Sequence, residues 1–106
     1  MISFNHDTAN NQLTIRFNGR LDTLSCPDIQ SAINDKFSKI RKEGKQDGPK
    51  VVFNMQEVTF ISSSFIRICL TTFHGCGKGN FAILNCDPFL KKTFKIAGLD
   101  DLLTVS

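Results

Sequence analysis

The chain has 106 residues, of which 41% are hydrophobic and 22% are charged, a balance typical of a globular domain that can bury a core without disulfides or metals. Its net charge of +3 is too small for a dedicated nucleic-acid binder. No apolar run is long enough to span a membrane, so we expect one cytoplasmic domain over residues 1–106, without nucleic-acid binding or membrane insertion.

The aromatic residues are ten Phe, with neither Trp nor Tyr. The aromatic part of the core must therefore come from Phe alone. We expect Phe17, Phe37, Phe53 and Phe94 to be largely buried, because they fall on the apolar faces of the elements predicted below.

Four cysteines occur, and none of them forms a close CxxC pair. We interpret them as reduced thiols, buried as small apolar residues in a reducing compartment. A zinc site built from Cys69, His74, Cys76 and Cys86 is the alternative, but this spacing matches no standard zinc module. We therefore expect neither a metal nor a cofactor.

The N-terminal third reads as a hairpin followed by a helix. Apolar residues alternate with polar ones over 2–6 and 13–17, with turn-forming residues between, which predicts two half-buried strands. Residues 19–22 read as a short turn or edge element. Ser25 with Asp28 resembles a capping box, and it predicts a helix over 27–41.

The remainder alternates strands with helices. A polar loop over 41–50 precedes a short buried strand over 51–55, and a second helix is expected over 63–75. Another strand follows over 81–84. Asp87 and Pro88 then begin a third helix, expected over 88–97, and a short apolar tail ends the chain. This order predicts an α/β fold with a mixed, mostly parallel sheet.

The second helix is unusual because apolar residues cover most of its circumference, leaving a narrow polar stripe that contains Arg67, Thr71 and His74. Such a helix is either buried nearly all round or presents an apolar surface to a partner. Three consecutive serines, Ser62 to Ser64, stand at its start. They can act as helix caps, or they can provide a hydroxyl whose phosphorylation would place negative charge on the surface.

Three segments in register resemble the STAS family, in particular the bacterial anti-sigma factor antagonists. They are Gly19-Arg20-Leu21-Asp22, the stretch from Val51 through Ile61-Ser62-Ser63-Ser64-Phe65, and the closing Phe94 to Leu103 with its Gly98-Leu99 pair. The second resembles the family's buried strand followed by Asp-Ser-Ser-Gly at a helix start. The resemblance covers nearly the whole chain.

The resemblance implies a STAS-like sheet with helices packed on one side and an N-terminal hairpin. It implies that the protein binds a serine-kinase anti-sigma factor, that the kinase phosphorylates Ser64, with Ser63 as the neighbouring candidate, and that a metal-dependent serine phosphatase reverses this. It places the partner-binding surface around the second helix. We expect it to contain Asp22, Thr23, Ser62, Phe65 and Arg67.

Two positions depart from the family pattern: Ser62 replaces Asp, and Phe65 replaces Gly. We expect Phe65 to be exposed, where it would either block a partner's backbone or act as an apolar anchor. One alternative is a STAS subunit that binds an ATPase or a transporter component without phosphorylation. Another is a small enzyme that uses Cys76 or His74, but no pattern supplies an oxyanion hole, so we predict no catalytic residue.

Overall fold

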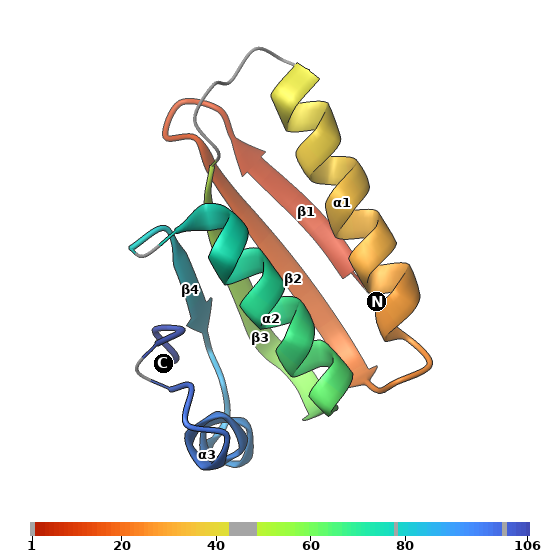
Figure 1. Cartoon of the computed structure of the whole chain (residues 1–106), viewed down its shortest axis with the longest axis vertical. Coiled ribbons are helices and arrows are strands. Elements are labelled where there is room, and N and C mark those ends of the chain that lie inside the picture. Colours follow the sequence, from red (N-terminus) through yellow and green to blue (C-terminus); the bar gives the residue numbers. More distant parts are fainter. Residues whose placement is uncertain (1, 43–48, 78, 101) are drawn as a thin grey trace.

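A computed structural model of the chain describes residues 2–42, 49–77, 79–100 and 102–106, so most of the polar loop expected over 41–50 lies outside the described residues. Four strands form one sheet in the order β1-β2-β3-β4, and three helices connect or follow them (Figure 1). The elements are β1 (Ile2–Asp7), β2 (Gln12–Leu21), α1 (Cys26–Lys42), β3 (Lys50–Ile61), α2 (Ser63–Cys76), β4 (Phe81–Leu84) and α3 (Pro88–Ile96).

The sheet is mixed and mostly parallel, as predicted. β1 and β2 form the antiparallel N-terminal hairpin, with Ile2 opposite Phe17 and Asp7 opposite Gln12. β2 pairs with β3, and β3 with β4, in parallel. Each parallel pair is connected through a helix, α1 or α2, because parallel strands need a long crossover.

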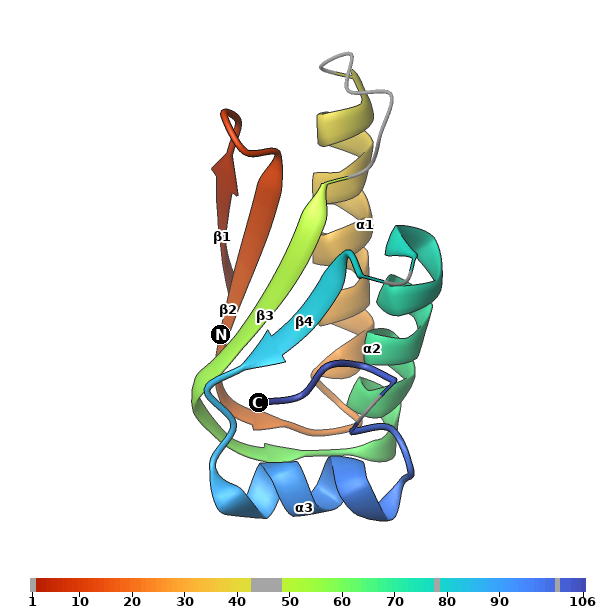
Figure 2. The same cartoon turned by 90° about the vertical axis from the view of Figure 1, so that its left-hand side faces the viewer.

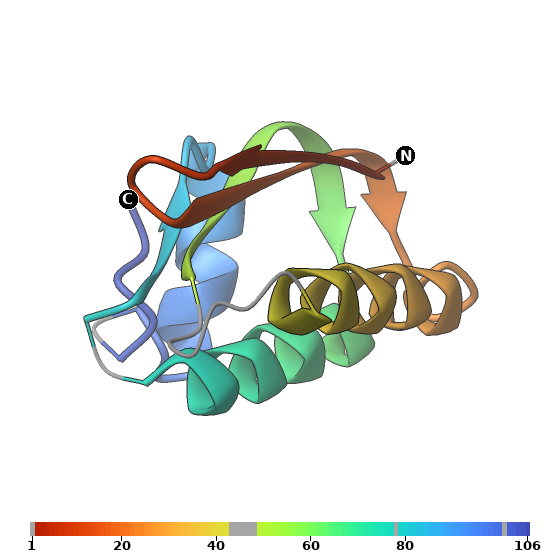
Figure 3. The ribbon, with the colours of Figure 1, turned by 90° about the horizontal axis from the view of Figure 1, so that it is seen from above.

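Two helices form the layer that covers the sheet. α1 and α2 lie side by side on one face (Figures 1 and 3), which confirms the predicted helical layer. α3 does not join that layer. It lies across the end of the sheet, beneath the curved carboxyl ends of β2 and β3 (Figure 2).

β2 and β3 are longer than the sequence pattern predicted. Residues 19–21, expected as a turn, belong to β2, and β3 runs to Ile61 rather than ending near residue 55. The register shifts between Arg16 and Asn18 and again between Gly19 and Arg20. Such irregularities bend a strand and hide its periodicity. Gly19 adopts a positive φ of 82° here, a conformation that favours glycine.

The core is centred on Phe side chains. The rings of Phe17 and Phe53 pack edge to face with centroids 4.9 Å apart, and Phe53 packs in the same way on Phe81. Phe17, Phe53 and Phe94 are fully buried, which confirms three of the four predicted core residues. Phe37 is less buried than the other three: it packs against the core as a partly buried residue, because it faces a cavity between α1 and α2.

Candidate functional site

The parallel pairing of β2 with β3 brings two segments far apart in sequence to the same edge of the molecule. β2 ends at Leu21 opposite Ile61, the last residue of β3. The Ser62 N–H then donates a hydrogen bond to the Leu21 carbonyl oxygen over 3.0 Å. The turn that leads into α1, which begins with Asp22, therefore lies beside the first turn of α2 (Figure 1).

Asp22 organises the turn between β2 and α1. Its Oδ1 accepts hydrogen bonds from the Ser25 backbone N–H at 3.0 Å and from the Ser25 hydroxyl at 2.8 Å. These bonds hold the pKa of Asp22 below its usual value of 3.8. Ser25 directly precedes α1, and its carbonyl oxygen accepts a hydrogen bond from the Ile29 N–H over 3.2 Å, while its hydroxyl donates to Asp22.

The three serines occupy different environments. Ser62 is the N-cap of α2: its hydroxyl accepts a hydrogen bond from the Phe65 N–H over 3.3 Å, and its carbonyl accepts one from Ile66. Ser63 is exposed and Ser64 is half-buried. Since Ser62 performs the capping, the presence of Ser63 and Ser64 is not explained by capping.

The predicted exposure of Phe65 is wrong. Its side chain is fully buried, and its ring packs edge to face on Phe17 with centroids 5.1 Å apart. Phe65 shares its helix face with Ile68, Cys69 and Thr72, the other buried residues of α2, at the i, i+3, i+4, i+7 spacing of a core-facing stripe. A buried ring cannot anchor a partner at the surface, and it does not block one either.

The other residues predicted to bind a partner lie at the surface near the serines. Thr23 is exposed in the turn before α1, and Arg67 is exposed on α2, one helical turn beyond Ser63 and Ser64. The sequence analysis missed Leu24, which is 89% exposed. The sequence did contain a sign of this exposure: Leu24 is an apolar residue in a polar turn, and it fits the periodicity of neither the preceding strand nor the following helix.

Cys26, Cys69 and Cys86 are buried, and Cys76 is partly buried. All four are free, and burial raises the pKa of the Cys76 and Cys86 thiols to about 11. A thiol that stays protonated at neutral pH is a weak nucleophile and metal ligand. Within the described ranges, no three His, Cys, Asp or Glu side chains are grouped so that they could hold a metal ion.

In the part of the chain that the structure describes, no helix is both long and apolar enough to cross a membrane.

Comparison with known proteins identifies the class. The sequence matches the STAS domain family over residues 3–106, so the chain belongs to the STAS family. A search of curated proteins finds no significant match.

Three solved structures share the fold. The anti-sigma factor antagonist SpoIIAA in its unphosphorylated form superposes with a TM-score of 0.76 and 19% identity, covering 100% of this chain and 88% of SpoIIAA. An anti-sigma factor antagonist from Mycobacterium paratuberculosis superposes with a TM-score of 0.76 and 19% identity, covering 99% of this chain and 85% of that protein. The phosphorylated form of the Bacillus cell fate determinant SpoIIAA superposes with a TM-score of 0.67 and 20% identity, covering 100% of this chain and 91% of that structure.

The Asp22 hydrogen bonds predict a specific pH dependence. Because the folded-state pKa of Asp22 is depressed, its ionised carboxylate stabilises the fold above about pH 4, and this contribution is lost as the pH falls through the folded-state pKa. Asp22→Asn should therefore lower the free energy of unfolding at pH 6, and the difference from the parent should shrink by pH 3. Urea denaturation at both pH values measures this. Asp35→Asn, at an exposed position on α1, controls for the lost charge, and a constant difference for Asp22→Asn would contradict the prediction.

The burial of Phe65 predicts a core phenotype for its truncation. Phe65→Ala should lower the free energy of unfolding by about 3–5 kcal/mol, because it removes a buried ring and leaves a cavity. Phe89→Ala truncates a ring that is 59% exposed and should change stability by less than about 1 kcal/mol. Urea denaturation of both variants measures the difference, and equal stabilities would show that Phe65 is not a core residue.

Proposed function

We propose that this protein is an anti-sigma factor antagonist that binds a serine-kinase anti-sigma factor and is switched by phosphorylation of Ser64 or Ser63. The observation that carries the proposal is the arrangement at one edge of the sheet. Two serines not needed for capping follow Ser62, which is hydrogen-bonded to Leu21, and the turn that leaves Leu21 carries an exposed Leu24. The shared fold with SpoIIAA and the family match support it.

The proposed contact surface consists of Thr23, Leu24, Ser63, Ser64 and Arg67. Asp22 and Ser62 hold this surface in shape through the hydrogen bonds described above. Leu24 is the natural anchor, because a solvent-exposed leucine gains about 1.5–3 kcal/mol when a partner buries it fully.

Phosphorylation at this position would change the surface without disrupting the fold. The first turn of a helix favours negative charge through the helix dipole, and exposed Arg67 stands at i+4 from Ser63 and i+3 from Ser64, where a helical side chain can pair with the added phosphate. The same charge would oppose the docking of an apolar or acidic partner surface at Leu24. A metal-dependent serine phosphatase would restore binding.

This function requires binding rather than catalysis, and we propose that the protein is not an enzyme. The raised pKa of Cys76 argues against the enzymatic alternative that uses this thiol as a nucleophile. We place the protein in the cytoplasm, where free thiols persist and where transcription is regulated.

A charge at Ser64 should weaken partner binding while leaving the fold intact. The partner is recovered by affinity purification from native cells, and binding is measured by calorimetric titration. We expect Ser64→Asp to weaken binding by about tenfold or more and Ser64→Ala to retain it, with a partial effect because Asp carries less charge than phosphate. Ser63→Asp tests the neighbouring serine.

Ser38→Asp is the matched control. It adds the same charge at an exposed position near the carboxyl end of α1, away from the turn that contains Leu24. Urea denaturation should show no loss of stability for Ser64→Asp, since an acidic residue in a first helical turn is favourable. Equal affinity of Ser63→Asp, Ser64→Asp and the parent would refute the switch. A purified partner that is an ATPase or transporter component, with no phosphate on the recovered protein, would favour the phosphorylation-independent alternative.

Truncation of Leu24 should affect binding but not stability. Leu24→Ala removes an exposed apolar side chain, so we expect about tenfold weaker binding to the purified anti-sigma factor with stability changed by less than about 0.5 kcal/mol. Leu102→Ala, at a position that is 47% exposed in the C-terminal tail, should change neither property. Unchanged affinity of Leu24→Ala would place the partner surface elsewhere.

A further inference from the structure

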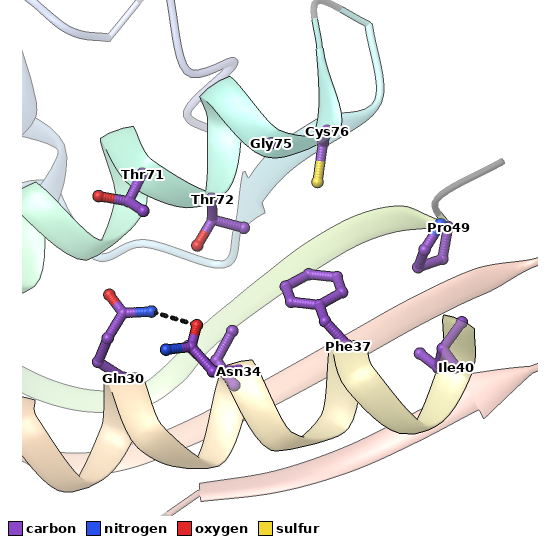
Figure 4. Close-up of a pocket in the computed structure, with 10 residues that line it drawn as sticks. Gln30, Asn34, Phe37, Ile40, Pro49, Thr71, Thr72, Gly75 and Cys76 are labelled. Carbon is purple, nitrogen blue, oxygen red and sulfur yellow. Dashed lines mark hydrogen bonds between the residues drawn. The ribbon is translucent and has the colours of Figure 1, made fainter. Parts of the chain in front are cut away.

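A cavity of about 260 Å³ lies between α1 and the second half of α2 (Figure 4). On the α1 side and at the start of β3 it is lined by Ile33, Phe37, Ile40 and Pro49. Phe37 is only partly buried because its ring faces this space. The cavity is larger than the ~150 Å³ cavities that take up benzene, so it has room for a mono- or bicyclic molecule.

Polar groups occupy one end of the cavity. The Gln30 side-chain N–H donates to the Asn34 carbonyl oxygen over 3.0 Å, and Thr71 lies across from this pair on α2. The Thr72 hydroxyl also belongs to the cavity wall, but its hydrogen is already donated to the Ile68 carbonyl oxygen. A mainly apolar wall with a few polar groups at one end is typical of small-molecule sites.

The charge of the lining restricts the ligand further. None of the described residues that line the cavity carries a charged side chain. From these residues an anion or cation would gain no ionic partner to replace the hydration it loses. Cys76, which also lines the cavity, stays protonated at neutral pH because burial raises its pKa to about 11.

We propose that this cavity binds a small, uncharged, mostly apolar molecule with one hydroxyl or amide group, which would contact Gln30, Asn34 or Thr71. The cavity is separate from the proposed partner surface. Thr71 and Gly75 lie two to three helical turns beyond Ser63, about 12–18 Å along the axis at 1.5 Å per residue. The two proposals can therefore fail independently.

Gly75 provides a variant that fills the cavity. It lines the cavity within α2, and a Cβ added there would meet nothing within 4 Å. Because Gly75 is part of the cavity wall, we expect the Gly75→Leu side chain to take up space there, and leucine is also the better helix former. His74→Leu is the matched control, because it adds a leucine at the neighbouring exposed position of α2 that does not line the cavity.

The experiment titrates the purified chain with 2-naphthalenemethanol and with 2-naphthoate, which share a ring system but differ in charge, and follows backbone amide shifts by NMR. We expect the alcohol to bind with a Kd in the millimolar range or tighter, with shifts concentrated in α1 and the second half of α2. The carboxylate should bind at least tenfold more weakly. Gly75→Leu should weaken alcohol binding at least tenfold and Gly75→Ala less, while His74→Leu should bind like the parent.

Three results would overturn the proposal: no saturable shifts with the alcohol, equal binding of alcohol and carboxylate, or unchanged binding by Gly75→Leu. Gly75→Ala adds a single methyl group and keeps the test valid if the larger variant fails to fold. Partner titrations of Gly75→Leu separate the two proposals, because the anti-sigma factor should bind this variant as it binds the parent.

Discussion

The parallel pairing of β2 with β3, from Gln12 opposite Lys50 to Leu21 opposite Ile61, is the constraint on which the rest of the structure depends. Parallel strands end at the same edge of a sheet, so the residues that follow them must meet there. The Ser62–Leu21 hydrogen bond joins the two exits directly. For this reason the turn at Asp22 and the serines of α2 lie at the same end of the sheet.

The position of Phe65 shows how a family pattern can be altered without altering the surface. The family's Gly at this point presents no side chain to a partner. Here the residue is the largest apolar one available, yet its ring points into the core between Phe17 and Phe53. The outer surface of the first turn therefore remains open at this position. A phenylalanine thus contributes to the core at a position where the family pattern has glycine.

The two ends of α2 have different environments, which suits the helix to the two separate uses that we propose. Its first turn carries hydroxyls, a favourable dipole and a nearby arginine, features suited to a charge-based switch. Its second half faces α1 across a cavity whose described lining is uncharged. In the two proposals, electrostatics would govern the first site, whereas shape and burial of apolar surface would govern the second.

The sequence by itself determined the order and type of the elements, the parallel character of the sheet and the register of the STAS pattern. These follow from local periodicity and from caps such as Asp87, whose carboxylate accepts from the Leu90 N–H as the pattern predicted. Only the tertiary structure decided how far β2 and β3 extend, because strand length depends on a pairing partner and on the bulges that it imposes. It also decided that Phe65 points inward and Leu24 outward, because a side chain's direction depends on where its element sits against the sheet. Local sequence contains no information on that placement.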